Sequence, residues 1–360
     1  MRDILRRIAL HRSFWSGAPM DEPIVTYRIG DYFFANKFKA NLPLLENGRP
    51  LAPEDVDVDA YLEDYERMYM ECESTGQSGF FACEPCTGIP WIEGMMGCPI
   101  SGGSVSFVAT HVCDSLFDID IGELKLDHQN PWLLKYIEFL DKLTALAAGR
   151  FPVGQPIIRG TTDVIGTMIG HSELACSAIT DPEIMREALS QIAEVQREII
   201  AEQYRHIKPF HGGYAAGFYH LWAPGTIIWY QEDLSAILSK HHFDEYIRDT
   251  SEHICSGYDY SFVHLHPNSF FHLDGILSLQ NLSAVQINKD VGGPSVEKML
   301  PLFRQVVAAD KRLILWGDFT PEEVTMVMDA LPHKGLAFNI VASTVDDAKG
   351  INEIIVSRWR

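Results

Sequence analysis

The hydrophobic pattern is most regular in the last third of the chain, where short apolar runs alternate with amphipathic segments. Runs rich in β-branched and aromatic residues, bounded by polar residues, predict strands. The predicted strands are residues 260–266, 284–288, 312–316 and 336–341. Strands separated by helices pair in parallel through right-handed crossovers. Four such units, with at least one more upstream, predict an α/β fold of the closed (β/α)8 type, the TIM barrel, rather than an open sheet.

Two helix starts are marked by capping signals. Thr320 precedes a proline, and Glu323 follows three residues later, which is the spacing of a capping box. Pro182 opens a second segment, in which apolar residues recur at helical spacing. Upstream of that helix, residues 156–162 read as a strand that runs into a polar loop.

The first 110 residues are less periodic than the rest. They hold several prolines, an acidic run at residues 54–59 and a stretch rich in glycine and cysteine at residues 76–103. We interpret residues 1–110 as an N-terminal elaboration with the first barrel segments, and residues 150–360 as the regular β/α units of one domain that spans residues 1–360. The charges in the first twelve residues predict a short amphipathic helix rather than a signal peptide.

Composition narrows the range of functions. The chain has 29 basic and 49 acidic residues, a formal net charge of −20. Proteins that bind nucleic acid need a basic surface, so no nucleic-acid partner is expected. Seven cysteines are an odd and ordinary count, which is typical of the reducing cytoplasm. The longest stretch without charged residues, 209–231, contains histidines, glycines and a proline; it predicts buried loop and strand near a pocket rather than a membrane span.

The strongest candidate for chemistry is the pair His264 and His266 at the end of a predicted strand. Alternate residues of a strand share a face, so both imidazoles are expected to point into a pocket at the carboxyl side of the barrel. Two imidazoles at this spacing are common metal ligands, and zinc is the ion they would take. The alternative is a metal-free polar pocket in which both rings donate to carboxylates. The candidates for a third ligand are Asp233, His272, Asp274, Asp290 and Asp318.

Other polar residues are candidates for catalysis or for binding a small-molecule substrate. Asp233 follows Glu232, and adjacent carboxylates can divide acid and base roles between them; Asp318 follows another predicted strand at the same rim. Arg159, at a strand end beside two threonines, is a candidate anchor for a carboxylate. The remaining candidate substrate-binding residues are Trp91, His220, Trp222 and Trp316. For the aromatic residues, ordinary core packing is the alternative.

Missing motifs argue against several classes of enzyme. The chain has no G-x-x-x-x-G-K-[ST] loop, no G-x-G-x-x-G after a strand and no G-x-S-x-G elbow. No nucleotide cofactor is therefore expected. Cys83 and Cys86 have C-x-x-C spacing, but no second pair accompanies them, so we interpret them as free cysteines rather than a zinc ribbon or a redox pair.

Several segments together resemble the uroporphyrinogen decarboxylase superfamily, which also contains the cobalamin (corrinoid) methyltransferases. They are residues 88–99, 159–170, 231–235, 264–266 and 315–318. The resemblance extends from about residue 80 to the C-terminus and implies a (β/α)8 barrel enzyme. Where the decarboxylases are expected to carry an arginine-rich motif, residues 27–31 offer one arginine. Where the zinc methyltransferases carry His-x-Cys and a later cysteine, this chain has His-x-His and no cysteine at the last strand, so a zinc site here would be rich in nitrogen and oxygen ligands.

The resemblance leads to three alternative functions. The first is transfer of a methyl group from a small methylated substrate, an ether or an amine, to a corrinoid carried by a partner protein. In this function His264 and His266 bind metal or donate protons, Asp233 and Asp318 act as acid, base or ligand, and Arg159 holds the substrate. The second is decarboxylation of a small carboxylate or a porphyrinogen without metal. The third is a non-catalytic barrel that binds a ligand. A homodimer is an open alternative for each.

Overall fold

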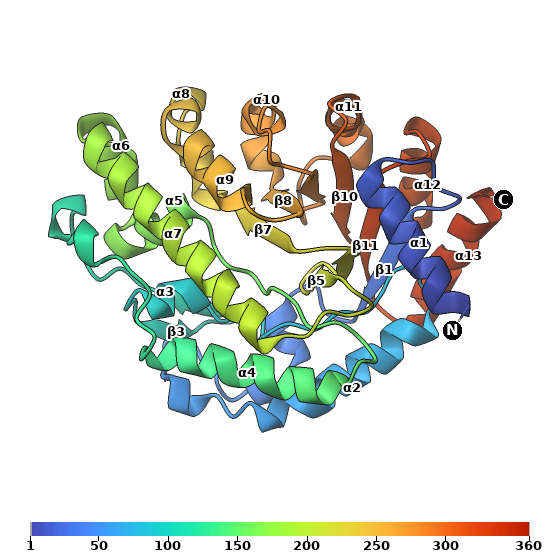
Figure 1. Ribbon diagram of the computed structural model, residues 1–360, viewed down its shortest axis with the longest axis horizontal. Helices are drawn as coiled ribbons and strands as arrows, with labels where there is room; N and C mark the ends of the chain where they lie inside the picture. Colours follow the sequence, from blue (N-terminus) through green and yellow to red (C-terminus); the bar gives the residue numbers. More distant parts are fainter. Residues whose placement is uncertain (1, 360) are drawn as a thin grey trace.

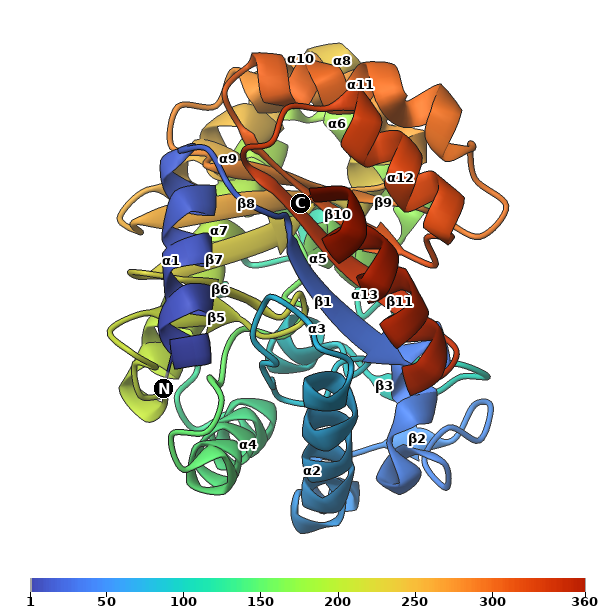
Figure 2. The same ribbon diagram turned by 90° about the vertical axis from the view of Figure 1, so that its right-hand side faces the viewer.

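The computed structural model describes residues 2–359 and shows a mixed α/β protein. Its central sheet has six parallel strands in the order β1-β11-β10-β9-β8-β7. The strands are β1 (Ile24–Ile29), β7 (Ile227–Gln231), β8 (Tyr260–Leu265), β9 (Ala284–Asn288), β10 (Arg312–Gly317) and β11 (Leu336–Ala342). Helices lie in an arc on the outside of this sheet (Figure 1), and α1 (Arg2–Ser16) and α13 (Val345–Trp359) flank β1 (Figure 2).

The four strands predicted from the apolar runs are confirmed as β8, β9, β10 and β11, and their parallel pairing is confirmed as well. The predicted helices are confirmed as α7 (Pro182–His206) and α12 (Pro321–Ala330), together with the amphipathic N-terminal helix α1. At the start of α12, the Glu323 amide donates to Thr320 Oγ1 at 3.3 Å, and the Thr320 amide donates to Glu323 Oε2 at 2.9 Å. These reciprocal bonds satisfy two amides that a helix start leaves unpaired.

The remaining helices surround the sheet and the N-terminal part of the chain. They are α2 (Asp59–Ser74), α3 (Trp91–Met95), α4 (Pro131–Ala147), α5 (Thr161–Ile169), α6 (His171–Thr180), α8 (Lys240–His242), α9 (Arg248–Cys255), α10 (Leu273–Leu277) and α11 (Val296–Ala308). Within residues 2–359, no helix combines the length and the apolar character needed to cross a membrane.

Alternation along the strands divides the core into two clusters. Tyr230 and Val263 point outward and pack with the cluster that includes the surrounding helices. Trp229 and Phe262, one position earlier on the same strands, belong to a separate cluster on the opposite face, and their rings are stacked with centroids 5.9 Å apart. We call the face that carries Trp229 and Phe262 the inner face of the sheet. Polar side chains at the carboxyl end of this face form the candidate site described below.

Two irregular segments, residues 78–84 and 151–160, run between the edge strands β1 and β7. The Gly79 amide donates to Val25 O at 3.0 Å, which joins the first segment to β1. A single parallel bridge, between Cys83 and Val153, joins the two segments to each other. On the other side, the side chain of Gln155 replaces a backbone ladder: its Oε1 accepts from the Trp229 amide at 3.0 Å, and its Nε2 donates to Trp229 O at 2.5 Å.

The strand predicted at residues 156–162 is wrong. Residues 156–160 are irregular, and Thr161 already begins α5. Pro156 has no amide hydrogen to donate to a ladder. Gly160 lies so close to β7 that a Cβ on it would be 1.7 Å from Gln231 O, so the chain approaches this edge through contacts that a strand with side chains could not make.

The uncharged stretch 209–231 contains a hairpin that packs on the inner face of the sheet. Its strands are β5 (Tyr214–Ala216) and β6 (Leu221–Ala223). At its tip, Phe218 O accepts from the guanidinium of Arg28 on β1, and Tyr219 O accepts from Asn339 Nδ2 on β11 at 3.0 Å. The prediction of buried loop and strand for this stretch is confirmed.

The first 110 residues contribute to two of the sheets. They provide β1 of the central sheet and also a small antiparallel sheet at one edge of the molecule. The strands of the small sheet are β2 (Pro50–Leu51), β3 (Ile100–Gly102) and β4 (Phe107–Ala109). The loop from β3 through β4 lines the cleft described in the next section.

Candidate functional site

Polar side chains gather on the inner face where β7, β8 and β9 end. Parallel pairing places Gln231 beside His264, and His264 beside Gln286. Because side chains alternate between faces, residues two positions further along point the same way. Those residues are Asp233, His266 and Asn288. The carboxyl ends of parallel strands thus bring together groups that are far apart in the sequence.

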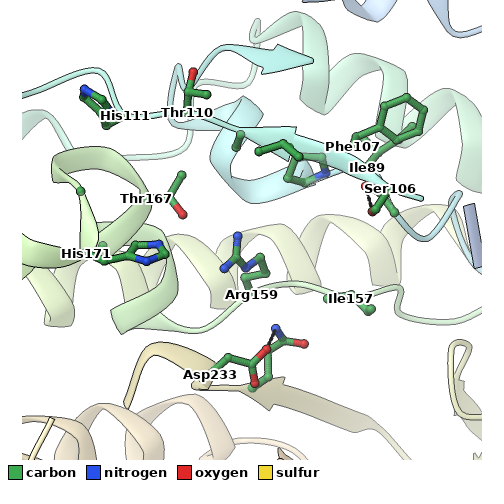
Figure 3. A pocket seen from close by; sticks show the side chains of 17 residues that line it. Ile89, Ser106, Phe107, Thr110, His111, Ile157, Arg159, Thr167, His171 and Asp233 are labelled. Carbon is green, nitrogen blue, oxygen red and sulfur yellow. Dashed lines mark hydrogen bonds between the residues drawn. The ribbon is translucent and has the colours of Figure 1, made fainter. Parts of the chain in front are cut away.

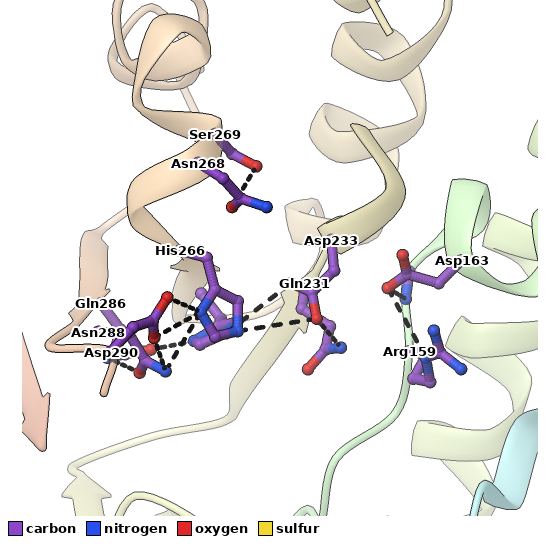
Figure 4. A network of polar contacts seen from close by, with 12 residues as sticks. Arg159, Asp163, Gln231, Asp233, His266, Asn268, Ser269, Gln286, Asn288 and Asp290 are labelled. Carbon is purple, nitrogen blue, oxygen red and sulfur yellow. Dashed lines mark hydrogen bonds and ion pairs between the residues drawn. The ribbon is translucent and has the colours of Figure 1, made fainter. Parts of the chain in front are cut away.

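Asp233, His264 and His266 form a compact triad. Asp233 Oδ1 lies 3.8 Å from His264 Nε2, and Asp233 Oδ2 lies 3.9 Å from His266 Nε2. One donor atom from each of the three residues lies within 4.8 Å of the others. Figure 4 shows His266 between Asp233 on one side and Asp290 on the other. Of the five predicted candidates for a third ligand, Asp233 is the one that meets both imidazoles at their Nε2 atoms.

The other ring nitrogen of each histidine already has partners. His266 Nδ1 donates to Asp290, at 2.8 and 2.9 Å from the two carboxylate oxygens. His264 Nδ1 lies 2.9 Å from the hydroxyl of Tyr219 and is also hydrogen-bonded to Gln286 Oε1. Both Nε2 atoms therefore remain available on the side that faces Asp233.

Burial and charge give the triad different proton affinities. Burial, together with the neighbouring His266, lowers the pKa of His264 to about 3, so this imidazole is neutral at pH 7. Burial also lowers the pKa of His266, but its hydrogen bond to Asp290 and the charge of Asp233 outweigh burial and raise that pKa above the usual value. Burial raises the pKa of Asp233, against the opposing charges of His266 and Arg159.

This arrangement fits a divalent metal ion such as zinc. Two imidazoles and a carboxylate are a common ligand set for zinc, with an open position for water or substrate. A tetrahedral ion with bonds of about 2.0–2.1 Å separates its ligands by about 3.3–3.4 Å. The donor atoms here lie within 4.8 Å of one another, so the three side chains would have to move closer together to hold such an ion. The second nitrogen of each histidine is held by a hydrogen bond, which is the usual support for a metal-bound imidazole.

The triad lies where two cavities meet. The first, of about 610 Å³, is lined by Arg159, Asp233, Thr167 and His171 among others (Figure 3). The second, of about 480 Å³, is lined by His266, Asn288, Asp290 and the aromatic residues Tyr32, Phe33, Phe34 and Trp316. Gly88, Ser106 and Ile157 line both. We call the two cavities together the cleft. It offers a polar end beside Arg159 and an aromatic end beside Trp316.

Arg159 reaches the cleft but already has acidic partners. Its Nη1 donates to Glu93 at 2.9 Å, and its Nε lies 4.0 Å from Asp163. Burial raises the pKa of Glu93, although the charge of Arg159 acts in the opposite direction. Around Arg159, the carboxylates outnumber the guanidinium, so the cleft is a better environment for a cation than for a polycarboxylate.

Glu232 and Asp233 have separate roles in the structure. The carboxylate of Glu232 accepts from the amides of Thr161 and Thr162 at 2.8 and 2.9 Å and from both threonine hydroxyls. It therefore fixes the start of α5, while Asp233 lines the cleft. Burial and the nearby Asp163 raise the pKa of Glu232 to about 7.

The structure places the other candidate ligands outside the triad. Asp318 lies 3.2 Å from Lys289 Nζ, and its side chain is 55% exposed. His272 Nε2 donates to Ser235 O at 2.9 Å, and Asp274 forms an ion pair with Lys240. Asp290 accepts from Nδ1 of His266 and is therefore a neighbour of a ligand candidate rather than a member of the triad.

The candidate substrate-binding aromatics fall into two groups. Trp316 lines the cleft, and its buried Nε1 has no hydrogen-bond partner within residues 2–359. Trp91 packs against aromatic residues of α4, and Trp222 donates to Phe210 O, so both are core residues. His220 lines a small cavity beside Arg28 and has a left-handed backbone with φ of 51°. Core packing explains Trp91 and Trp222.

Sequence reasoning gave no role at the site to Gln286 or Asn288, and it did not connect Tyr219 with His264. The signal for the first two was present, because Gln286 and Asn288 alternate with apolar residues on β9 and Asp290 continues the pattern. Tyr219 gave no local signal, because it reaches His264 from a hairpin 45 residues earlier in the chain. Cys83 and Cys86 are both buried, and burial raises the pKa of each thiol, as expected for free cysteines.

Two comparisons based on the sequence identify no family for the chain. A scan against protein-family models finds none that matches the chain, and a search of the curated proteins finds no match. The fold and the site therefore define a class, an α/β protein with a histidine- and carboxylate-lined cleft at the carboxyl end of a parallel sheet. The resemblance to the uroporphyrinogen decarboxylase superfamily stays a prediction.

Proposed function

We propose that the chain is a metal-dependent enzyme of the uroporphyrinogen decarboxylase superfamily that transfers a methyl group from a small methylated substrate to a corrinoid carrier. The observation that carries the proposal is the triad of Asp233, His264 and His266 at the centre of the cleft. The resemblance supplies the reaction class, and the geometry supplies the reason to expect a metal.

The proposed fold is a closed (β/α)8 barrel. In this interpretation, the irregular segments 78–84 and 151–155 would take the positions of the second and third strands between β1 and β7. Backbone bonds from Gly79 to β1 and from Cys83 to Pro152 support closure, as do the bonds between the Gln155 side chain and β7. A closed barrel also accounts for the cleft, since active sites of such barrels lie at the carboxyl ends of the strands.

Asp233, His264 and His266 would hold the ion through Nε2 atoms and a carboxylate oxygen. A divalent ion there would polarise the oxygen or nitrogen that bears the methyl group and stabilise the charge left on it. In the balanced reaction, the methyl carbon loses its bond to that heteroatom and gains a bond to reduced cobalt, and the leaving group takes a proton from solvent.

The protein residues bind and orient the substrate. Tyr32, Phe34 and Trp316 form an aromatic wall next to His266. The ring centroids of Tyr32 and Phe34 lie 4.7 and 5.6 Å from that of Trp316. Such a wall suits the apolar part of a small ether or amine. Arg159 lies at the other end of the cleft and orients a polar substituent.

The acidic cleft favours methyl transfer over decarboxylation. A decarboxylase must hold a carboxylate, and Arg159 is already paired with Glu93 and faces Asp163. Binding a further anion beside Asp233 and Asp290 would be opposed by their charges. A divalent cation in the triad would instead offset these carboxylates.

A corrinoid carrier protein would have to approach the open side of the cleft. Exposed apolar residues on the cleft's lining suit such a partner: Phe33, Val105, Val108 and Val291 are 48, 36, 50 and 72% exposed. Exposed apolar groups around a pocket are typical of interaction sites.

The test combines metal analysis with a methyl-transfer assay. Purified protein is expected to contain one zinc per chain and to methylate cob(I)alamin from a member of a panel of small methyl ethers and methylamines. His264→Ala and His266→Ala are expected to lose both zinc and activity. His241→Ala is the matched control, because His241 is exposed and pairs with Glu245.

The outcomes separate the alternatives. Protein without stoichiometric zinc, after expression in zinc-supplemented medium, would contradict the metal-dependent reaction. Release of carbon dioxide from a carboxylate, with no methyl transfer and no effect of metal removal, would favour the decarboxylase.

A further inference from the structure

We propose that Gln286, Asn288 and Asp290 act as positioning residues that place the proton of both site histidines on Nδ1, so that both Nε2 lone pairs face Asp233. We call these three residues the β9 ladder. The proposal rests on the metal site proposed above, but its first test needs no metal. According to the proposal, a hydrogen-bond network on the neighbouring strand selects the imidazole tautomer that can bind a metal.

The β9 ladder is built by the register of the sheet. Gln286 on β9 lies opposite His264 on the paired strand β8, and Asn288 follows two residues later on the same face. Gln286 and Asn288 are 0 and 5% exposed, so they have no alternative partners in bulk water. Figure 4 shows the three side chains side by side next to His266.

The direction of each hydrogen bond follows from Asp290. Both oxygens of the Asp290 carboxylate lie within hydrogen-bond distance of His266 Nδ1, at 2.8 and 2.9 Å, and a carboxylate only accepts. Asn288 therefore turns its Nδ2 to Asp290 Oδ1, at 3.2 Å. Its Oδ1 is left to accept from Gln286 Nε2, at 3.1 Å. Gln286 Oε1 is then the atom that meets His264 Nδ1.

Asp290 determines which nitrogen is protonated in both imidazoles, directly for His266 and through Asn288 and Gln286 for His264. His264 Nδ1 must donate, because Gln286 presents a carbonyl oxygen to it, and His266 Nδ1 must donate to Asp290 directly. Tyr219 is compatible with this assignment, because its hydroxyl oxygen can also accept from His264 Nδ1. In a neutral imidazole, a proton on Nδ1 leaves the lone pair on Nε2. The ladder thus pre-organises two nitrogen ligands before any ion arrives.

The first test measures the proton positions directly. Side-chain ¹⁵N chemical shifts of His264 and His266 are recorded in metal-free protein at alkaline pH, where both rings are neutral. Both are expected to carry the proton on Nδ1. A proton on Nε2 of His264 would overturn the proposal, whatever the protein's metal affinity.

The second test uses variants of Gln286. In Gln286→Leu, His264 Nδ1 loses its amide acceptor, and the dissociation constant for zinc, measured by competition with a chelator, is expected to rise about 10–100-fold. Gln286→Glu keeps an acceptor at that position and is expected to retain the Nδ1 proton and most of the affinity. A merely structural role would make the two variants equally defective.

Gln203→Leu is the matched control. The buried amide of Gln203, on α7 and outside the site, accepts from the Tyr136 hydroxyl at 2.7 Å. Its removal should leave zinc affinity unchanged. Asp290→Asn extends the test, because it removes the acceptor that orients the ladder. If the wild type binds zinc and both Gln286→Leu and Asp290→Asn bind it equally well, the proposal is refuted. If the wild type shows both Nδ1 protons but binds no zinc, the proposed function fails and the assignment of the ladder stands.

Discussion

The two sides of the central sheet hold their side chains in opposite ways. On the side of β8 and β9, a continuous backbone ladder aligns the strands, and side chains such as His264 and Gln286 are left to interact with each other. On the side of residues 78–84 and 151–160, the ladder is broken. There the side chain of Gln155 pairs with the backbone of β7, and Ser78 Oγ accepts from the Val25 amide of β1 at 2.8 Å.

The difference separates groups that stabilise the fold from groups that remain for chemistry. Where backbone groups pair with each other, buried polar side chains remain free to form a site. Where side chains complete the backbone, their loss leaves buried amides unpaired, which costs free energy of unfolding. The comparison predicts that removing a polar side chain from residues 78–84 or 151–160 reduces stability. Removing one at the site should instead reduce ligand binding. The predictions below follow the size of the expected change in stability.

Gln155→Leu should have the largest effect. It removes the partners of both the amide and the carbonyl of Trp229. Leaving two buried backbone groups unpaired is expected to lower the free energy of unfolding by about 2–4 kcal/mol, measured by urea denaturation. Gln203→Leu, which removes one side-chain partner, should cost about 1 kcal/mol. Equal losses in the two variants would contradict the role given to Gln155.

His11 should make stability depend on pH. It lies on α1, is fully buried, and its Nδ1 donates to Trp222 O at 2.7 Å. Burial lowers its pKa from 6.5 to about 3, so between these values the unfolded chain binds the proton that the folded chain excludes. Stability is thus lost as the pH falls below about 6.5, and this residue contributes about 2 kcal/mol of loss at pH 5.

The measurement compares urea denaturation of the wild type and His11→Gln at pH 7 and pH 5. The variant should lose less stability than the wild type over this interval. Parallel pH profiles for the two proteins would show that His11 is not the titrating group.

Thr320→Ala tests the regular side of the sheet. The variant loses the acceptor of the Glu323 amide at the start of α12, an exposed site. A lost N-cap of this kind typically costs about 1 kcal/mol. Thermal denaturation would detect it, and restoring the hydroxyl with Thr320→Ser should recover most of the loss. A cost as large as that of Gln155→Leu would remove the contrast between the two sides.

Asp233→Asn should change stability least. The carboxylate accepts from Gln231 Nε2 at 2.8 Å, a bond that an amide oxygen can keep, so the free energy of unfolding should stay within about 0.5 kcal/mol of the wild type. Zinc affinity, in contrast, should fall, because an amide is a weaker ligand than a carboxylate. A strongly destabilised Asp233→Asn variant would place this residue among the structural groups.

Sequence reasoning was most accurate where local pattern and tertiary structure agree. The apolar runs of β8 to β11 and the capping box of α12 are local signals, and the structure confirms them. The strand prediction for segment 156–162 is wrong because distant side chains bond its backbone: Gln196 donates to Arg159 O, and Glu232 accepts from the amides of Thr161 and Thr162. No local pattern contains those pairings.

The same reasoning applies to the site. His264 and His266 share a strand, so their common face could be inferred from spacing, and their meeting with Asp233 required only adjacent parallel strands. The partners at Nδ1 depend on register between strands and on a hairpin tip, which spacing does not give. Trp91 and Trp222 were placed near the cleft on residue type alone, and core packing holds them elsewhere.

The hairpin tip also constrains the order of folding. Its carbonyl groups accept from Arg28, 190 residues earlier, and from Asn339, 120 residues later. Neither bond can form until the first and last strands have come together, and closing such long loops is slow. Tyr219 therefore reaches His264 late, and a chain released from the ribosome without β11 would lack Asn339 as an anchor beneath the site. The site would therefore assemble only after β11 has been synthesised, although all of its candidate ligands come earlier in the chain.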